Sequence, residues 1–294
     1  MVRISVVVPT YNLAGVIGRT LESVQRQTSL PDEIIVLDDG SGDATRSEAA
    51  EAAARFPSGI VRVIAAPHGG PGAARNRAID QATGDWVAFL DGDDLWAPEK
   101  IEKLRAVIAS NVAATMIAHD EYESDLNGGT IYKRLHERFN PSKPLLTQLY
   151  RGNFLSTSCI AVKRELLSAV GGLDETLPAA QDYDLWLKLA RAARLVFIPE
   201  PLETYVLREN SITSRVLMRA ECMTRIAFRH APWVAAETGP ARAWVLRLRA
   251  LAIAYISLIR QSFSHSPAEA VRLLLRALGG LLRAVISPLA VSEN

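Results

Sequence analysis

Short apolar runs alternate with helical periodicity along the first hundred residues of the chain. The runs at 4–9 and 33–38 are almost continuously apolar, as expected of strands that are covered on both faces. Between them, apolar side chains recur at helical spacing: Leu13, Ile17, Leu21 and Val24. This alternation is typical of βαβ units, so the pattern predicts an α/β fold with a Rossmann-like, mostly parallel central sheet flanked by helices.

The same pattern continues along the next hundred residues. It predicts strands at 61–66, 86–91, 112–118 and 195–198. It predicts helices between Pro71 and Gly84, from Pro98 to about Ser110, over 163–170 and over 183–193. The polar stretch 122–144, which contains Asn127-Gly128-Gly129, predicts a hairpin or a mobile loop.

The composition is that of a folded protein with a sizeable core. Apolar residues make up 49% of the 294 residues, which excludes a disordered or low-complexity chain. The two cysteines have no metal-like spacing and are typical of a reducing compartment. The first apolar run ends at Pro9 and is too short for a signal peptide, so we expect a cytoplasmic protein.

The C-terminal part of the chain is basic, and we expect it to form a helical extension. Residues 205–294 contain 12 Arg and 5 Glu and carry a formal charge of +7, against −6 for residues 1–204. The apolar run 250–259 is shorter than the about 20 residues that a membrane-spanning helix needs. The amphipathic stretch 268–289 has two interpretations. It forms a helical hairpin that covers the core or makes a homodimer, which we favour, or it lies at a membrane surface.

Three of the predicted strands end in polar clusters: Thr10-Tyr11-Asn12, Asp38-Asp39-Gly40-Ser41 and Asp91-Gly92-Asp93-Asp94. In an open parallel sheet, ligands bind outside the carboxyl ends of the strands. Each cluster alone is also explained as a turn or a helix cap. Their joint placement favours a single binding site at one edge of the sheet.

The cluster at 91–94 brings three carboxylates together directly after a buried strand. Carboxylates at such close spacing resist ionisation unless a cation lies between them. Hard oxygen ligands suit Mn²⁺ or Mg²⁺, and substrate phosphates commonly complete the coordination shell of magnesium. The cluster therefore predicts a divalent metal and a phosphorylated ligand, with a solvated acidic turn as the alternative.

Five motifs together resemble a family 2 glycosyltransferase of the GT-A fold. They are S-V-V-V-P-T-Y-N at 5–12, I-V-L-D-D-G-S-G-D-A-T at 35–45, G-G-P-G-A-A-R-N-R-A-I at 69–79, G-D-W-V-A-F-L-D-G-D-D-L-W at 84–96 and Q-D-Y-D-L-W-L-K-L at 181–189. The resemblance covers about residues 3–214. It implies a transferase domain at 1–214, with a nucleotide-binding half at about 1–96 and an acceptor half at about 97–214. The basic helical extension at 215–294 is outside it.

The resemblance also implies what the protein binds and where it works. The donor is a nucleoside diphosphate sugar of the UDP or dTDP type, and its sugar is transferred with inversion to a hydroxyl acceptor. The acceptor is a saccharide or a lipid-linked glycan for surface polysaccharide, and no nucleic-acid partner is expected. The extension then provides either peripheral contact with the inner face of the plasma membrane or a homodimer contact.

The family pattern assigns roles to residues in the strand-end clusters. The residues expected around the nucleotide sugar are Pro9, Thr10, Tyr11, Asp39, Arg75, Asp91, Gly92 and Asp93. Tyr11 is available to stack on the base, and Asp39 is available as an acceptor for it. Asp93 corresponds to the principal metal ligand, and Asp91 to the first position of the D-x-D motif. Asp94 is expected only to cap the next turn.

Asp182 in Q-D-Y-D matches the family's catalytic base. From spacing alone, its simplest explanation is the N-cap of the helix that begins there. The sequence departs from the family at Gln181, where an acid is common. It also departs at Arg208, which replaces a histidine. Arg208 cannot ligate a metal as imidazole does, but it can pair with a phosphate.

Other functions and other candidate residues are weaker. The alternative to an enzyme is a non-catalytic protein of the same fold that binds nucleotide sugars. A nucleotidyltransferase would need a Gly-rich N-terminal loop, and P-T-Y-N stands there instead. For His119 we favour a structural role over a position on the acceptor side, and His68 is expected merely to be exposed.

Overall fold

The computed structural model describes residues 2–124, 129–207 and 216–263, and the single positions 271, 275, 279 and 282. Arg208 and, except for the four single positions, the amphipathic stretch 268–289 lie outside the described residues. Among the described helices, none is both long and apolar enough to cross a membrane.

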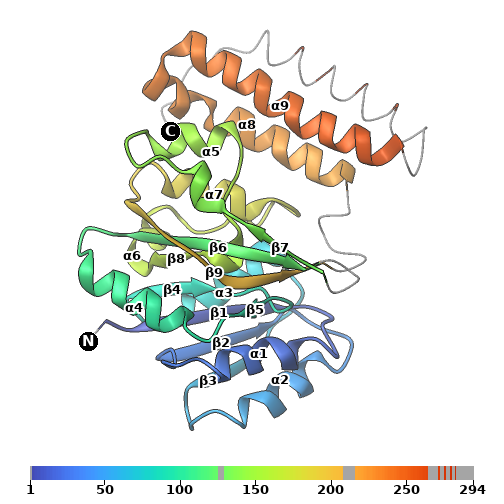
Figure 1. The fold of residues 1–294 in the computed structure, drawn as a ribbon. Coiled ribbons are helices and arrows are strands. Elements are labelled where there is room, and N and C mark those ends of the chain that lie inside the picture. Colours follow the sequence, from blue (N-terminus) through green and yellow to red (C-terminus); the bar gives the residue numbers. More distant parts are fainter. Residues whose placement is uncertain are drawn as a thin grey trace. The chain divides into compact units, whose positions relative to one another are not determined.

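The described elements alternate between strands and helices over the first two thirds of the chain (Figure 1). The strands are β1 (Ile4–Thr10), β2 (Glu33–Asp38), β3 (Val61–Ala65), β4 (Trp86–Phe89), β5 (Leu95–Trp96), β6 (Met116–Ser124), β7 (Thr130–Lys133), β8 (Ala161–Lys163) and β9 (Leu195–Val206). The α-helices are α1 (Ile17–Gln25), α2 (Thr45–Ala53), α3 (Pro71–Asp80), α4 (Lys100–Ser110), α5 (Leu145–Arg151), α6 (Arg164–Ala169), α7 (Gln181–Leu189), α8 (Val216–Thr238) and α9 (Pro240–Phe263). Two short 3₁₀ helices are η1 (Leu135–Arg138) and η2 (Thr157–Cys159).

The chain divides into two compact units. The first contains residues 1–140, 154–176 and 192–208 and holds the whole sheet. The second contains residues 141–153, 177–191 and 209–294 and holds α5, α7, α8 and α9. Helix α7, which carries the Q-D-Y-D motif, thus belongs to the same unit as the C-terminal helices.

The sheet of the first unit is mixed but mostly parallel, as the sequence predicts. Its strand order is β3-β2-β1-β4-β8-β6-β9-β5, with β7 paired to β6. The first four strands in this order are parallel to one another. Strand β8 is antiparallel to both β4 and β6, so that β6 and its parallel neighbour β9 run in the direction of β4.

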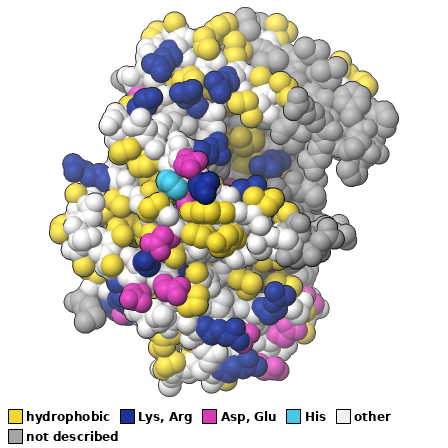
Figure 2. Space-filling model, viewed as in Figure 1, with side chains coloured by type: hydrophobic (Ala, Val, Ile, Leu, Met, Phe, Trp, Pro, Cys, Tyr) yellow, Lys and Arg dark blue, Asp and Glu magenta, His cyan; other side chains and the backbone are white. Residues whose placement is uncertain are grey.

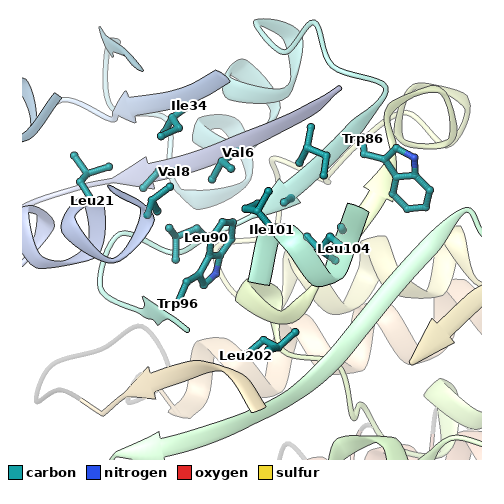
Figure 3. Close-up of a cluster of buried hydrophobic side chains, with 14 of the residues drawn as sticks. Val6, Val8, Leu21, Ile34, Trp86, Leu90, Trp96, Ile101, Leu104 and Leu202 are labelled. Atoms are coloured by element: carbon teal, nitrogen blue, oxygen red, sulfur yellow. The ribbon is translucent and has the colours of Figure 1, made fainter. Parts of the chain in front are cut away.

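Both faces of the parallel strands are covered, which explains their continuous apolar runs. On one face, Val6, Val8 and Ile34 pack in one buried cluster with side chains of α1, α2 and α4 (Figure 3). Helix α3 contacts β1 and β2, and its small residues Ala73, Ala74 and Ala78 are buried. Burial of a large aliphatic side chain is worth roughly 1.5–3 kcal/mol, so this core fixes the strands whose ends carry the polar clusters.

The predicted strands and helices are confirmed in type, with boundary shifts at several ends. The prediction of a strand ending at 198 is wrong, because β9 continues to Val206 through Pro199 and Pro201. Its pairing with β6 is irregular at that point, and such an irregularity accommodates proline in a sheet. Helix α2 was not predicted, because its buried face consists of one threonine and two alanines and gives little periodicity. The elements α5, β5 and β8 were not predicted either.

The second unit is built around two long helices with a one-residue connection. Gly239 joins α8 to α9 with φ = 84°, a conformation that favours glycine. Its N–H donates to Ala235 O at 2.8 Å and closes the last turn of α8. The Tyr150 hydroxyl of α5 donates to Ala227 O of α8, and the Tyr183 hydroxyl of α7 donates to Leu149 O of α5. These bonds tie α5 to both α7 and α8.

Candidate functional site

The order of the parallel strands creates a switch point between β1 and β4. From β1 the chain adds β2 and β3 on one side and then returns to place β4 on the other side. Crevices for ligands form at such points, outside the carboxyl ends of the strands. The loops that follow β1 and β4 carry the first and third polar clusters, at residues 10–12 and 91–94.

Hydrogen bonds join the loop after β1 to the loop after β2. The Asn12 N–H donates to Ser41 Oγ at 3.0 Å, and Asn12 Oδ1 accepts from the Gly42 N–H at 3.0 Å. Asn12 has φ = 51°, a left-handed conformation that asparagine tolerates better than most residues. The polar residues of these two clusters therefore hold each other, as the joint placement of the clusters predicts.

Asp39 is buried and holds the loop that leads into α3. Its carboxylate accepts the N–H groups of Gly69 and Gly70, both at 2.9 Å. It also lies 2.9 Å from His68 Nδ1 and 3.5 Å from Arg77 Nη1. The Asp39 carboxylate thus has four partners within the protein. A nucleotide base that donates a hydrogen bond to Asp39 would share the carboxylate with these four groups.

Tyr11 and His68 form a stacked pair beside Asp39. Their ring centroids are 4.3 Å apart with an interplanar angle of 27°, and Tyr11 is 46% exposed. His68 is exposed, as expected from the sequence, but the stacking with Tyr11 was not foreseen. The pair presents an ordered aromatic surface at the end of β1, which suits a planar base.

Arg75 is buried on α3 and forms an ion pair with Asp91 in the loop after β4. Its Nη1 also donates to Pro71 O at 3.4 Å. The side chain of Asp91 remains 28% exposed. The structure thus supplies a protein cation to one member of the acidic cluster and brings together two residues that the sequence assigns to the same site.

Gly92 allows the acidic turn to lie close against β1. A Cβ atom on Gly92 would lie 2.7 Å from Leu13 Cδ1 and 3.0 Å from Pro9 O. Thr10 is also buried there, and among the described residues its hydroxyl has no hydrogen-bond partner. Pro9, Thr10 and Gly92 are therefore brought together at the strand ends.

Asp94 does not cap the next turn, in contrast to the expectation from sequence. It is buried, accepts a hydrogen bond from Ser158 Oγ at 2.6 Å and accepts another from the Val206 N–H at 3.3 Å. Ser158 Oγ also accepts from the Asp91 N–H at 2.9 Å. Burial raises the pKa of Asp94, and the nearby charges of Glu203, Asp91 and Asp93 raise it further. Asp94 thus anchors the turn from inside, and Ser158 was not foreseen from sequence.

A buried network continues from Asp94 to Lys100, Glu203, Cys159 and Glu121. Lys100 Nζ donates to Ser158 O and lies 3.9 Å from the Trp96 ring centroid. Burial lowers the pKa of Lys100 to about 8 and raises that of Glu203 to about 7. The one buried ammonium therefore faces several acidic groups and partly neutralises them.

Three members of this network are the closest set of potential metal ligands among the described residues. The ligand atoms of Glu121, Cys159 and Glu203 lie within 4.8 Å of one another. Burial raises the pKa of each of the three groups, which favours their protonated forms. We therefore assign them to the support of the turn rather than to a metal centre.

The acidic turn suits a divalent cation with two carboxylates at most. Asp91 and Asp93 are both partly exposed, whereas Asp94 points into the core. Mg²⁺ and Mn²⁺ prefer oxygen ligands, and Mg²⁺ is commonly held by one or two carboxylates together with phosphates. The donor set therefore fits such an ion if a phosphorylated ligand supplies the other oxygens.

Asp182 lies at the second position of α7, in the second unit. The N-cap of this helix is Ala180, in a left-handed conformation with φ = 56°. The interpretation of Asp182 as the N-cap is therefore wrong. Its partly exposed carboxylate lies in the first turn, where the helix dipole favours negative charge.

Asp184 is buried and links α7 to α8. Its Oδ1 lies 2.9 Å from Arg229 Nη1 and 2.8 Å from His230 Nε2, both on α8, and its Oδ2 lies 3.1 Å from Lys188 Nζ. Burial alone raises the pKa of Asp184. The hydrogen bond from His230 and the neighbouring positive charges outweigh it and lower the pKa to about 2. Helix α7 is thus held by a helix of the C-terminal extension.

Two further features are the position of His119 and a pocket beside the loop after β2. His119 is fully buried, and burial lowers its pKa well below the usual value, so it does not line an exposed acceptor surface. A pocket of about 730 Å³ lies beside the loop after β2 and is lined by Asp38, Ser41 and Arg46 among others. Its lining contains neither Asp91 nor Arg75, so the pocket is not part of the acidic turn.

Comparisons with known proteins place the sequence among glycosyltransferases. The model of glycosyl transferase family 2 matches residues 5–171. An uncharacterized glycosyltransferase from Haemophilus influenzae is 33% identical over 189 residues, which are 63% of this chain and 61% of the relative. The succinoglycan biosynthesis protein ExoO from Rhizobium meliloti is 33% identical over 226 residues, which are 73% of this chain and 63% of ExoO. The chain thus covers less than two thirds of either relative.

A solved structure shows the same fold. Residues 1–349 of S. aureus TarS, in complex with UDP-GlcNAc, match with a TM-score of 0.76 and 23% identity. The match covers 96% of this chain and 81% of that one. The predicted GT-A architecture is confirmed by this similarity.

Proposed function

Because the chain belongs to glycosyl transferase family 2, we propose that it transfers a sugar from a nucleoside diphosphate donor to a hydroxyl acceptor with inversion at the anomeric carbon. The single observation that carries this proposal is the switch point, where the Arg75–Asp91 pair, Gly92 and the exposed Tyr11 ring lie at the ends of neighbouring strands. We assign transfer to residues 1–214 and an accessory role to 215–294.

We assign each part of a nucleotide sugar to different residues at the strand ends. The exposed face of the Tyr11–His68 pair takes the base, for which we propose uracil or thymine. The partly exposed Asp91 carboxylate receives a ribose hydroxyl while Arg75 holds its other oxygen. We also assign Thr10 to this site, where its side chain lies against Gly92. Arg208, outside the described residues, is proposed to pair with the diphosphate.

We assign the diphosphate to the acidic turn, with Asp93 as the main ligand for Mn²⁺ or Mg²⁺ and Asp91 beside it. A divalent cation there supplies positive charge to the leaving diphosphate, whose negative charge grows as the glycosidic bond breaks. Asp94, Ser158 and the buried network below keep the backbone of the turn in place. The turn therefore needs no reorganisation when the donor binds.

Asp182 is the proposed general base. In an inverting transfer, the acceptor oxygen forms a bond to the anomeric carbon as the bond from that carbon to the diphosphate breaks, and the acceptor hydroxyl gives its proton to the base. Asp182 is partly exposed and lies on a helix that the buried Asp184 fixes from two residues away. The structure thus supplies an accessible carboxylate on a rigid element.

The test begins with a thermal-shift screen of nucleotide sugars in the presence of Mn²⁺, followed by turnover with the donor that stabilises the protein most. The variant Asp182→Asn should lose transfer, with a rate at least 10²-fold lower. Its donor affinity should stay within about twofold of that of the wild type. Undiminished transfer by this variant would refute the assignment of the base.

The alternative is a non-catalytic protein of this fold that only binds nucleotide sugars. It predicts donor binding without release of nucleoside diphosphate, even in the presence of a library of saccharide acceptors. Asp91, Asp93 and Asp182 in their family positions favour the enzyme. Diphosphate release that depends on an acceptor would exclude the alternative.

The exposed side of α9 supports a further part of the proposal, contact with an anionic membrane surface. Val245, Ile253 and Ile256 are 47–56% exposed, and Arg242 and Arg249 are exposed on the same side. The sequence of α9 contains no acidic residue. Over α8 and α9, the face drawn in Figure 2 shows mainly dark blue and yellow side chains. Arginines among aliphatic side chains suit an interface of anionic lipids.

Vesicle flotation tests this contact. The full chain should float with vesicles that contain phosphatidylglycerol and stay behind with phosphatidylcholine alone. The double variant Ile253→Ser, Ile256→Ser should lose flotation, whereas Val112→Ser, at a position that is 86% exposed in the first unit, should retain it. Equal recovery of all three proteins would contradict membrane contact. A change in oligomeric state without a change in flotation would assign the face to a homodimer.

A further inference from the structure

The hairpin of β6 and β7 carries a row of aromatic and polar side chains on one face. Tyr122 of β6 pairs directly with Tyr132 of β7 in the antiparallel register. Their ring centroids are 5.6 Å apart at an angle of 48°, and Tyr122 is 38% exposed. The hairpin therefore presents a two-ring aromatic surface to solvent. Nothing in the assignment of the donor site uses it.

The inner end of this row is organised by Asp120, a fully buried carboxylate on β6. Its Oδ2 accepts the Tyr132 hydroxyl at 2.8 Å and lies 2.6 Å from His136 Nδ1, and its Oδ1 accepts the His136 N–H at 2.9 Å. The bonds fix the rings of Tyr132 and His136 from below. Burial raises the pKa of Tyr132 to about 12, and the hydrogen bond to Asp120 adds to the effect, so this hydroxyl stays a donor.

The contact with Asp120 also determines which nitrogen of His136 is available. Nδ1 is occupied by this contact, so Nε2 is the ring nitrogen left for a ligand hydroxyl, which can either donate to it or accept from it. The His136 side chain is 31% exposed. A ring nitrogen in a fixed orientation thus lies at the end of an aromatic surface.

Arg134 adds donors to the same face. Its guanidinium lies over the Tyr132 ring at 5.1 Å from the centroid, and its Nε is 3.9 Å from Glu137. The side chain is exposed, and a guanidinium has more donors than these contacts use. The face therefore combines two aromatic rings, one imidazole nitrogen in a fixed orientation and several donors.

We propose that this face, formed by Tyr122, Tyr132, Arg134 and His136 over Asp120, binds the saccharide acceptor. A pyranose ring has one side lined by C–H groups, which packs on aromatic rings, and a rim of hydroxyls that both donate and accept hydrogen bonds. The two tyrosine rings pack against the C–H side, and His136 Nε2 and Arg134 form hydrogen bonds with the hydroxyls. The assignment of this saccharide as the acceptor rests on the proposed transferase function, whereas saccharide binding itself does not.

A purely structural role explains only part of the arrangement. Asp120 closes the end of the hairpin through its bonds to Tyr132 and His136. Closure alone requires neither the exposed ring of Tyr122 nor an exposed His136. Ile131 is 56% exposed on the same strand as Tyr132, and alternation of side chains places it on the opposite face of the hairpin. It provides a matched control.

The experiment uses NMR to measure saturation transfer from the full-length protein to three probes. The probes are methyl β-D-glucopyranoside, methyl β-D-galactopyranoside and methyl α-D-mannopyranoside. At least one probe should receive saturation at its ring C–H protons. The signal should fall about tenfold in Tyr122→Ala and His136→Gln and should persist in Ile131→Ala. The variant Tyr132→Phe keeps the ring and removes only its hydrogen bond to Asp120, so it should show a smaller loss. Each variant is first checked for native circular dichroism.

The two proposals fail in distinguishable ways. The absence of saturation transfer to all three probes, or an equal signal in Tyr122→Ala and the wild type, would overturn the hairpin site. UDP titrations on the same samples report on the donor site, and the hairpin variants should bind UDP as the wild type does. A protein that binds a probe through the hairpin but neither binds nor turns over a nucleotide sugar would retain the saccharide site and refute the transferase.

Discussion

Replacement of Asp184 by asparagine tests how the C-terminal helices support α7. The carboxylate is fully buried and contacts Arg229, His230 and Lys188. Burial lowers the pKa of His230, so at pH 7 its imidazole is neutral and provides a hydrogen bond, while the two cations provide the charge. Asparagine keeps the shape of the side chain and removes its charge.

The magnitude follows from the pKa of Asp184. It is about 2 in the folded protein, against 3.8 as the ordinary value. This difference corresponds to about 2 kcal/mol of stability at pH 7. Because the folded pKa is the lower one, the contribution is complete above the ordinary value and is lost as the pH falls toward 2. At pH 3 about half of it, roughly 1 kcal/mol, should remain.

The assay is urea unfolding followed by circular dichroism at pH 7 and pH 3. Asp184→Asn should lose about 2 kcal/mol at pH 7 and about half as much at pH 3 relative to the wild type. The matched control is Asp80→Asn, an exposed position at the end of α3, which should stay within about 0.5 kcal/mol at both values. An unchanged stability of Asp184→Asn at pH 7, or an equal loss at both values, would refute the reasoning.

Other predictions concern the strand ends and the network below them. Gly92→Ala should destabilise by about 1–3 kcal/mol in thermal unfolding because its Cβ would clash, whereas Gly42→Ala, with open space around its Cβ, should be neutral. His68→Ala should weaken UDP binding about fivefold in calorimetric titrations without a change in the maximal transfer rate, because Tyr11 loses its stacking partner. Lys100→Met should cost about 3–5 kcal/mol in urea unfolding, because buried carboxylates lose their ammonium; a loss below about 1 kcal/mol would contradict the network.

The contacts of Asp184 also predict what removal of the C-terminal extension does to α7. A chain that ends near residue 214 lacks Arg229 and His230 and leaves the carboxylate with Lys188. Such a truncation should destabilise α7 as well as remove the extension. Point substitutions on the exposed side of α9 separate the two effects.

The fold could be predicted from sequence where local patterns decide it. The continuous runs of β1 and β2 and the helical spacing of α1 specify a βαβ unit, and the polar strand ends indicate the edge of the sheet at which we propose that ligands bind. Helix α2 could not be predicted because its buried face is small. The predicted strand at 195–198 was too short because two prolines follow it, and the irregular pairing of β9 with β6 accommodates them.

The contacts between side chains could not be predicted, because they join segments that are distant in sequence. The Arg75–Asp91 pair spans 16 residues, and the bond from Ser158 to Asp94 spans 64. No spacing rule indicates that Asp94 points inward while Asp91 stays partly exposed. Similarly, the hairpin predicted at 122–144 gave no indication that Asp120 would fix His136.

The most direct test of the central claim is the release of nucleoside diphosphate from UDP- and dTDP-sugars by the wild type and Asp93→Asn in the presence of Mn²⁺ and a saccharide acceptor. We expect release by the wild type and a loss of at least 10²-fold in the variant, because we assign the leaving diphosphate to the acidic turn. Equal rates in the two proteins, or no release from any donor, would contradict it.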